Sequence, residues 1–531
     1  MSFKVLLLDN VDSVCAEIFR SRGITADQPE RPDLEKIQSI LKEYHAVVIR
    51  SATTFDEELI RSAGDLRVIG RAGVGVDNID IEAATRQGIL VMNTPDGNTI
   101  STAEHTCGMI LSLARNIPEA VKRVKSGGWD RKKFMGSEVY GKVLGIIGLG
   151  KIGSEVAARM KSFGMEIIAY DPFTTQEQAK RIGVELMELK EVLSNADFLT
   201  VHTPLTEKTR NLVSLENADL LKPGIRLVNC ARGGIFKEED LIPLIEKGIV
   251  AAAALDVYTI EPPTAEMYEI LQHPAIICTP HLGASTEEAQ EKVAVQIAHQ
   301  ISDALENKGY KGSINGKSIS LLTNDEVQPY VELAEKLGRV SGQIMPDNST
   351  SFSFEYTGIC TGYSEVLSDA ILKGMLTQYV DESVNLINAR HYAVERGFSI
   401  SETKKSDDKN YQDLITVKIG DASQYKQISA AVFGPGDYRI VEIDGFGIEL
   451  RLEGDILMYQ NIDKPGMLAA VAGKLASQNI NIGALSLGRE GKGTNAITAV
   501  IIDKKLTTDE VRSIQQIEGV HGVKYISLSG S

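Results

Sequence analysis

Short apolar runs recur along the first part of the chain, and each is followed by a stretch in which apolar positions have helical spacing. The runs are rich in Val, Ile and Leu, and they cover residues 5–8, 46–49, 68–70 and 89–92. Continuous apolar runs of this length indicate strands that are buried on both faces. The pattern therefore predicts a first unit in which a parallel sheet is wrapped by helices.

A second series of apolar runs begins after a helical stretch from Ser101 to Asn116. These runs cover residues 143–147, 166–170, 198–201, 226–229, 252–255 and 275–278. The alternation is typical of a doubly wound α/β fold. A further helical stretch, Thr286 to Leu305, could carry the chain back onto the first unit. We therefore expect a discontinuous first domain over residues 1–97 and 287–314, and a second domain over residues 98–286.

The pattern changes after residue 314. Helical spacing over Glu326–Gln343 and Glu365–Glu395 is followed by alternating strands such as Leu414–Lys418. From Asp455 to Leu528 the order is strand, helix, strand, strand, helix, strand, which packs as a small βαββαβ sandwich. We expect an α+β third domain over residues 315–454 and a fourth domain over residues 455–531. The predicted fold class is α/β, with two Rossmann-like domains at the start.

Composition and charge narrow the possible functions. The formal net charge of −16 over 531 residues disfavours nucleic-acid binding, and an anionic ligand needs a local arginine cluster. The five cysteines are widely spaced without a CxxC pair, which favours reduced thiols over disulfides or a metal site. The first apolar run is too short for a signal peptide, and no later run has the length of a membrane span. We expect a cytoplasmic protein.

A glycine-rich loop lies between the strand that ends at Ile147 and the helical stretch that follows. Its glycines allow a tight turn, close approach of the backbone to a pyrophosphate, and packing of the helix on the strand. Asp171 closes the next strand, where a carboxylate can accept both ribose hydroxyls and repel an additional 2′-phosphate. The sequence therefore predicts NAD as the cofactor. The loop residues expected at the cofactor are Gly148, Gly150, Lys151, Ile152 and Gly153.

Hydride chemistry at a carbon that carries a hydroxyl needs a base for the proton and a cation for the developing carbonyl. His281 follows a strand end in the segment TPHLGA, at the edge of the sheet where ligands bind in this architecture. Histidine is the side chain whose pKa best suits a base near neutral pH. His281 is therefore the candidate acid/base.

Three motifs that follow the glycine-rich loop resemble the D-isomer-specific 2-hydroxyacid dehydrogenases. They are NCARGG at residues 229–234, ALDVYTIEP at residues 254–262 and PHLG at residues 280–283. The segments GRAGVGVDN (70–78) and WDRKKFMG (129–136) are most similar to the branch of that family that acts on 3-phosphoglycerate. The resemblance implies NAD-dependent oxidation of D-3-phosphoglycerate to 3-phosphohydroxypyruvate, the first step of phosphorylated serine biosynthesis, by a homotetramer.

The resemblance also implies residue roles. His281 is the acid/base, Glu261 hydrogen-bonds its far ring nitrogen, and Arg232 grips the substrate carboxylate and polarises the C2 oxygen. The further cofactor contacts that it implies are Val74, Thr203, Cys230, Ala231, Asp256 and Gly283. The expected substrate contacts are Arg50, Ser51, Arg71, Gly73, Asn98 and Arg131. Arg131 is either a solvated side chain or a phosphate ligand, in its own or a neighbouring subunit.

The C-terminal segment QNIDKPGML at residues 460–468 resembles the amino-acid-binding ACT domain. Such domains pair side by side and, in serine-biosynthetic dehydrogenases, bind L-serine at the paired interface. The resemblance implies effector contacts from Asn461, Asp463 and Asn481; the alternative is that DKPG is only a turn before a helix. The region 315–454 resembles the intervening domain of the longer enzymes, with an implied role in allosteric coupling.

Two other functions stay open at this point. A dehydrogenase for glycerate, glyoxylate or another 2-hydroxyacid would share Arg232, Glu261 and His281, and only the arginine cluster argues against it. An NAD-sensing transcriptional corepressor of the same fold is an alternative from another class. It predicts a protein-binding cleft in place of phosphate donors, and it has no use for an ACT domain.

Overall fold

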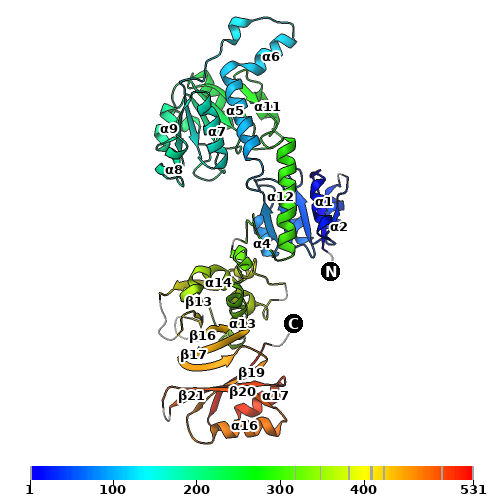
Figure 1. Cartoon of the computed structure of the whole chain (residues 1–531), viewed down its shortest axis with the longest axis vertical. Helices are drawn as coiled ribbons and strands as arrows, with labels where there is room; N and C mark the ends of the chain where they lie inside the picture. Colours follow the sequence, from blue (N-terminus) through cyan, green and yellow to red (C-terminus); the bar gives the residue numbers. More distant parts are fainter. Residues whose placement is uncertain are drawn as a thin grey trace.

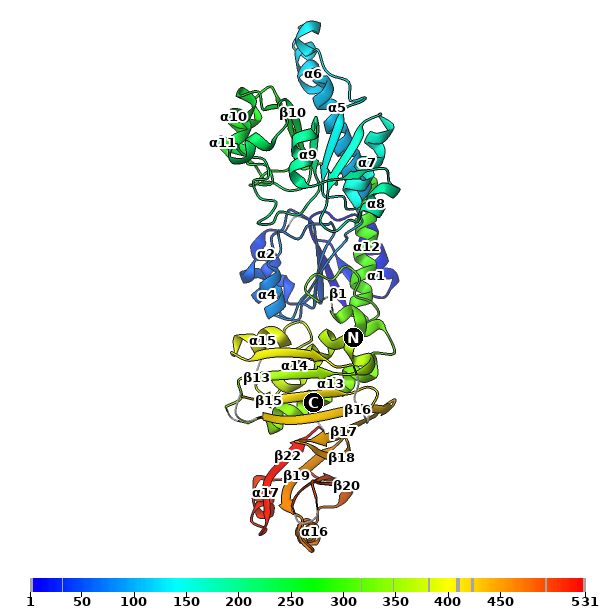
Figure 2. The same cartoon turned by 90° about the vertical axis from the view of Figure 1, so that its left-hand side faces the viewer.

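The computed structural model describes residues 3–30, 32–316, 318–346, 348–380, 383–406, 411–421, 425–491 and 494–528. Four sheets divide this part of the chain into four units, which lie along one elongated molecule (Figure 1). The second unit stands at one end and the fourth at the other, with the first and third between them (Figure 2). The structure confirms the predicted α/β fold class. Among the described residues, no helix combines the length and apolar character that crossing a membrane requires.

The first unit is a parallel five-stranded sheet in the order β2-β1-β3-β4-β5. Its strands are β1 (Lys4–Leu7), β2 (Thr25–Asp27), β3 (Ala46–Ile49), β4 (Val68–Arg71) and β5 (Leu90–Asn93). Its helices are α1 (Val14–Ser21), α2 (Leu34–Leu41), α3 (Glu57–Arg61), α4 (Ile81–Arg86) and, from later in the chain, α12 (Glu287–Leu305). One face of the sheet shares a core with α1 and α12, and the other face packs on α2, α3 and α4. The domain limits themselves stay a prediction.

The second unit is a parallel seven-stranded sheet in the order β12-β11-β10-β9-β6-β7-β8. The strands are β6 (Val143–Ile147), β7 (Glu166–Tyr170), β8 (Glu185–Leu186), β9 (Phe198–Val201), β10 (Ile225–Asn229), β11 (Val250–Leu255) and β12 (Ile276–Cys278). The helices are α5 (Thr99–Arg115), α6 (Ile117–Lys125), α7 (Lys151–Ser162), α8 (Gln176–Arg181), α9 (Leu189–Asn195), α10 (Leu241–Glu246) and α11 (Ala265–Leu271), with 3-10 turns η1 (Arg131–Phe134), η2 (Leu215–Leu220) and η3 (Glu238–Asp240). The strand order reverses between β6 and β9, so the crevice for a ligand opens beyond their carboxyl ends.

The third unit is a mixed six-stranded sheet in the order β14-β13-β15-β16-β17-β18. Its strands are β13 (Ser351–Tyr356), β14 (Ser399–Lys404), β15 (Ile415–Gly420), β16 (Tyr425–Gly434), β17 (Asp437–Ile443) and β18 (Phe446–Arg451). Its helices are α13 (Gln328–Ile344), α14 (Ser364–Leu376) and α15 (Ala389–Glu395), with 3-10 turns η4 (Ser318–Thr323) and η5 (Gly358–Tyr363).

The helical stretch predicted over Glu365–Glu395 is wrong in its middle, because α14 ends at Leu376 and α15 begins at Ala389. Asn385 shapes the chain just before α15. Asn385 Oδ1 accepts hydrogen bonds from the backbone amides of Ile387 and Asn388, a local pattern that competes with the helix. Asn385 Nδ2 also donates to the carbonyl of Gly88 in the first unit, at 2.8 Å. The segment therefore joins the third unit to the first.

The fourth unit is an antiparallel sheet in the order β20-β21-β19-β22. It contains β19 (Asp455–Ile462), α16 (Met467–Ser477), β20 (Ile482–Arg489), β21 (Asn495–Ile502), α17 (Thr508–Gln515) and β22 (Val520–Ser527), the expected βαββαβ order. One face of the sheet packs on α16 and α17. The other face packs against α13 and the third sheet. The third and fourth units therefore share one hydrophobic core.

Candidate active site

His281 and Glu261 form a hydrogen-bonded pair at the carboxyl edge of the second sheet. Glu261 lies in the loop after β11 and His281 in the loop after β12, and Nδ1 of the ring is 2.7 Å from Oε2 of the carboxylate. The other carboxylate oxygen accepts a hydrogen bond from the Tyr258 amide at 3.0 Å. His281 has a left-handed backbone, with φ of 53°. Because Nδ1 faces Glu261, Nε2 is the ring atom left to exchange a proton with a ligand.

The charges around this pair set its protonation. The hydrogen bond to Glu261 raises the pKa of His281, and the charges of Glu261 and Asp256 outweigh burial and nearby Arg232. Burial alone would raise the pKa of Glu261, but the bonds from His281 and the Tyr258 amide bring that pKa below its usual value. The pair can therefore take up a proton on the ring while the carboxylate stays ionised.

Three arginines gather where the first and second units meet. Arg50 follows β3, Arg71 ends β4, and Arg232 lies in the loop after β10. Burial, together with repulsion from Arg232 and Arg50, lowers the pKa of Arg71 to about 10. Asp77 and Asp9 oppose this effect only in part. In a protein of net charge −16, such a concentration of cations is a site for an anion.

Arg232 reaches from the second unit to a loop of the first. Its Nε is 3.1 Å from Oδ2 of Asp77, and its Nη1 donates to the carbonyl of Ala231 at 2.7 Å. A Cβ at Gly75 would lie 2.2 Å from Nη2 of Arg232, so only glycine permits this approach. Gly73 likewise lies under the guanidinium of Arg71, whose Nη1 would be 2.0 Å from a Cβ there. Gly73 and Gly75 of the GRAGVGVDN segment thus make room for the two guanidiniums.

The glycine-rich loop joins β6 to α7 at the point where the strand order reverses. Gly148 has φ of 92°, and a Cβ at Gly153 would lie 2.2 Å from the carbonyl oxygen of Gly148. A Cβ at Gly150 would meet no atom within 4 Å, so the backbone there faces open space. Gly150 caps α7 without a side-chain hydrogen bond, which leaves the first amides of the helix for a ligand. Lys151 forms an ion pair with Asp96.

Asp171 and Thr203 lie on either side of this loop. Asp171 accepts the amide of Leu149 on one oxygen, at 2.7 Å, and the amides of Phe173 and Thr174 on the other. It therefore orients the loop as well as closing β7. The Oγ1 atom of Thr203 is buried and has no hydrogen-bond partner among the described residues. Open space at Gly150 and this unpaired hydroxyl fit a dinucleotide.

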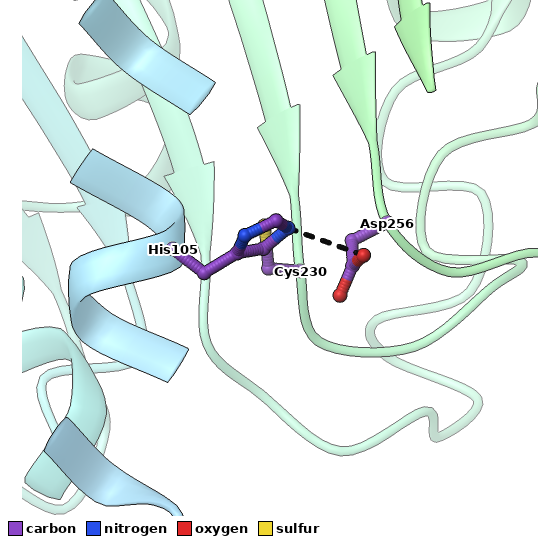
Figure 3. A group of neighbouring side chains, drawn as sticks. All are labelled: His105, Cys230 and Asp256. Atoms are coloured by element: carbon purple, nitrogen blue, oxygen red, sulfur yellow. Dashed lines mark ion pairs between the residues drawn. The ribbon is translucent and has the colours of Figure 1, made fainter. Parts of the chain in front are cut away.

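The buried residues Asp256 and Cys230 form a cluster with the partly exposed His105 (Figure 3). Their ligand-type atoms lie within 4.8 Å of one another, so a metal site has to be considered. The chemistry disfavours it. Burial raises the pKa of Cys230 to about 12, which keeps it a neutral thiol. Both oxygens of Asp256 already accept hydrogen bonds from the protein.

Other expected site residues are distributed as follows. Val74 lies in the loop that faces Arg232, and its carbonyl accepts from Asn93 Nδ2. Asn98 precedes α5, with a buried Oδ1 that has no partner among the described residues. Ser51 is exposed beside Arg50. Arg131 is exposed in η1, on the segment that projects with α6 away from the two sheets (Figure 1). The structure therefore does not bring Arg131 to the arginine cluster of its own chain.

The three expected effector residues do not meet within one chain. Asn461 and Asp463 lie at the end of β19 that pairs with Asn495, where Asp463 forms an ion pair with Arg489 at 3.5 Å. Asn481 precedes β20 and donates to Asp503 at 2.6 Å, at the opposite end of the sheet. Strand geometry puts the two ends roughly 20 Å apart.

Sequence reasoning missed four contacts of the site. Asp77 and Asn78 bind Arg232 and Arg71, and both stand in the GRAGVGVDN segment, so their position was a usable signal. His105 and Thr279 both contact Asp256. His105 lies inside a helical stretch and nothing in the local pattern distinguishes it from a packing residue.

Two family descriptions match the chain. The NAD-binding domain of D-isomer-specific 2-hydroxyacid dehydrogenases matches residues 107–283, and the D-3-phosphoglycerate dehydrogenase intervening domain matches residues 326–444. The chain is 42% identical over 493 residues to the D-3-phosphoglycerate dehydrogenase of Bacillus subtilis, covering 92% of this chain and 93% of that protein. This chain belongs to the D-3-phosphoglycerate dehydrogenase family. As a member of that family it is an NAD-dependent oxidoreductase.

Further comparisons agree with this membership. The D-3-phosphoglycerate dehydrogenase of Synechocystis is 39% identical over 527 residues, which cover 99% of this chain and 95% of that protein. Among solved structures, a glyoxylate reductase from Paecilomyes thermophila superposes with a TM-score of 0.54 at 28% identity, covering 59% of this chain and 98% of that one. A D-lactate dehydrogenase from Aquifex aeolicus, solved with NAD and lactic acid, gives a TM-score of 0.51 at 25% identity, over 57% of this chain and 96% of that one.

Proposed function

We propose that the chain oxidises D-3-phosphoglycerate to 3-phosphohydroxypyruvate with NAD as the hydride acceptor. The observation that carries this proposal is the gathering of Arg50, Arg71 and Arg232 beside the pair formed by His281 and Glu261. This substrate has a carboxylate at one end and a phosphate dianion at the other, with the reacting hydroxyl next to the carboxylate. Several guanidiniums in one place match two anionic groups on one small molecule.

Each end of the substrate has its own cations. Arg232 comes from the same unit as His281, and it holds the carboxylate and polarises the C2 oxygen. Arg50 and Arg71 come from the first unit and bind the phosphate. Since Arg232 also pairs with Asp77 of the first unit, the substrate binds where both units contribute to one site.

The proton of the C2 hydroxyl passes to Nε2 of His281 as the C2–H bond gives up its hydride. Glu261 holds the opposite ring nitrogen, which fixes the tautomer and stabilises the imidazolium that forms. The raised pKa of His281 makes the ring an adequate acceptor near neutral pH. The developing carbonyl oxygen is stabilised by the positive charge of Arg232.

NAD fits the crevice between β6 and β9. Gly148, Gly150 and Gly153 with the start of α7 would hold the pyrophosphate, and Asp171 would bind the ribose. Bound NAD supplies the hydride acceptor. The remaining contacts that we propose from this chain are Val74, Thr203, Cys230, Ala231, Asp256 and Gly283.

The decisive experiment measures NADH formation with D-3-phosphoglycerate beside unphosphorylated D-glycerate, in wild type and in Arg71→Gln. We expect wild type to prefer the phosphorylated substrate, and the variant to lose about 10- to 150-fold of that preference, the value of a charge-assisted hydrogen bond. The matched control is Arg61→Gln, an exposed arginine of the same unit. Equal kcat/KM for both substrates in wild type would favour the alternative, a dehydrogenase for another 2-hydroxyacid.

We further propose that the fourth unit binds L-serine between two copies of the chain, within a homotetramer, and restrains the enzyme. Asn461 and Asp463 lie at the opposite end of the sheet from Asn481, so a single site that contains all three requires a second copy. When two such sheets lie side by side and run in opposite directions, the end of one sheet that carries Asn461 and Asp463 meets the end of the other sheet that carries Asn481. This pairing creates two equivalent sites. This geometry supports a shared effector site.

A further inference from the structure

A fully buried carboxylate lies directly beneath the loop that carries His281. Asp256 follows β11 and is 0% exposed. Its Oδ1 accepts hydrogen bonds from the amide of Leu282 at 2.7 Å and from Oγ1 of Thr279 at 2.6 Å, and its Oδ2 accepts the amide of Gly283 at 2.8 Å. These donors stand on both sides of His281 in the chain. Asp256 therefore holds the loop by hydrogen bonds on both sides of His281.

His105 approaches the same carboxylate from α5. Its Nε2 is 3.2 Å from Oδ1 of Asp256 (Figure 3). The same nitrogen is 3.2 Å from Oγ1 of Thr279. Because Thr279 donates its proton to Asp256, its oxygen is free to accept one, and the carboxylate only accepts. His105 is therefore the donor to both, with its proton on Nε2.

The loop needs such support because of its backbone. His281 has φ of 53°, in the left-handed region that a residue with a side chain rarely adopts. Its own amide donates to the carbonyl of Thr279 at 3.0 Å, and the two amides that follow are both bonded to Asp256. A strained conformation of this kind persists only when its surroundings hold it.

We propose that His105 is a positioning residue for His281, acting through Asp256 and Thr279. The contacts of His105 in the described part of the chain run to Thr279 and Asp256, not to His281 or Glu261. The proton on Nε2 of His105 is donated to the carboxylate of Asp256 and the hydroxyl of Thr279. This bonding holds both groups in the positions from which they orient the His281 loop. The inference rests on the proposed function of His281. The loop geometry that it explains is observed whatever the function of His281.

The electrostatics of Asp256 agree with this arrangement. Burial alone would raise the pKa of Asp256, yet hydrogen bonds from His105, Thr279 and the Leu282 amide bring that pKa below its usual value. The carboxylate is therefore ionised in a place where an unpaired charge would be costly. Its negative charge contributes in turn to the raised pKa of His281.

The test compares His105→Leu, which removes the donor, with His105→Gln, whose amide nitrogen can replace Nε2. Ser112→Ala, on the same helix and without a part in this network, is the control. We expect His105→Leu to lower kcat by about 10- to 100-fold, since small displacements of a reacting group cost rates of that order. NADH affinity, measured by fluorescence, should change less than about 3-fold. His105→Gln should keep most of the turnover.

A second readout needs no substrate. Hydrogen exchange of the amides of Leu282 and Gly283 should be faster in His105→Leu than in wild type, and close to wild type in His105→Gln. If His105→Leu does not fold, Thr279→Val removes the shared hydroxyl at nearly constant volume. This variant should show the same lower kcat and the same faster exchange of the Leu282 and Gly283 amides.

The outcomes separate the two proposals. Unchanged exchange and unchanged kcat in His105→Leu would overturn the positioning role. Equal loss of activity and of thermal stability in the Leu and Gln variants would also overturn it, because that result marks a packing residue. A third outcome is that wild type does not oxidise D-3-phosphoglycerate while exchange is faster in His105→Leu. That result would exclude the proposed substrate and support the positioning role of His105.

Discussion

At the scale of single residues, the site depends on carboxylates that pair with its functional groups. Glu261 lies behind His281, the exposed Asp77 beside Arg232, and the buried Asp256 beneath the loop that carries His281. Glu261 and Asp256 orient their partners through hydrogen bonds and raise the pKa of His281, whereas Asp77 forms an ion pair with Arg232 and opposes the lowering of the pKa of Arg71. Removing the charge without changing the shape therefore separates the two effects.

Glu261→Gln keeps an oxygen that can accept from Nδ1 of His281 but removes the negative charge. The pKa of His281 is raised first by its hydrogen bond to Glu261 and then by the charge of Glu261, so the pKa falls in the variant. Oxidation of the alcohol needs the neutral ring, so activity is lost as pH falls through that pKa. The acid limb of the kcat/KM profile should therefore move to lower pH, and the plateau should drop at least about 10-fold.

The matched control for that measurement is Glu266→Gln, an exposed carboxylate on nearby α11. Its profile should coincide with that of wild type. An acid limb that stays in place in Glu261→Gln, or moves to higher pH, would contradict the assigned pair.

At the scale of elements, the ends of strands position the chemistry. The loops after β6 and β9 open at the reversal of strand order, and Asp171 lies at the end of the neighbouring strand β7. Asp171 serves the loop as well, because Leu149 donates its amide to it at 2.7 Å. Truncation of Asp171 would therefore disturb the loop and the ribose contact together.

Asp171→Asn is the cleaner variant for cofactor choice. It keeps one of the two oxygens that accept backbone amides and removes the charge that repels a 2′-phosphate. The ratio of kcat/KM for NAD to that for NADP should fall by about 10-fold or more, corresponding to about 1.4 kcal/mol. Asp171→Ala should show the same change together with weaker binding of NAD. A wild type that already prefers NADP would refute the assignment.

At the scale of the whole molecule, packing connects the C-terminal unit to the first sheet. The third and fourth units share a core, and Gln343 of α13 exchanges two hydrogen bonds with the backbone of Ser527. Asn385 then ties the third unit to Gly88, just after α4. Packed contacts therefore connect a ligand site in the fourth unit, through the third unit, to the first unit, which carries Arg50 and Arg71.

L-serine should lower activity by favouring an inactive arrangement of the units, since a ligand shifts an equilibrium only through unequal affinity for its states. A coupling of about 1–3 kcal/mol corresponds to about 5- to 150-fold in apparent affinity. Asp463→Ala should abolish the effect and keep activity without serine, while Asp509→Ala, an exposed aspartate of α17, should respond as wild type does. Serine titrations by activity and by calorimetry measure both, and binding without inhibition would exclude the coupling.

The sequence by itself determined most of the elements and the chemistry-bearing motifs. Apolar runs predicted the strands of the two parallel sheets except the short edge strands β2 and β8, because a strand buried on both faces must be apolar throughout. The glycine loop could be placed because its strand, its helix and Asp171 are local features of the chain. His281, Glu261 and Arg232 came from the family resemblance of short motifs, and their roles stay predictions.

Only the tertiary structure decided which distant residues meet. The approach of Arg232 to Asp77 and the contact of His105 with Asp256 depend on the order of strands and the packing of α5, which no local pattern records. The break between α14 and α15 escaped prediction because Asn385 is satisfied by a carbonyl of another unit. Local periodicity reports the face that a segment buries, whereas the partner on that face is set by the free energy of the whole fold.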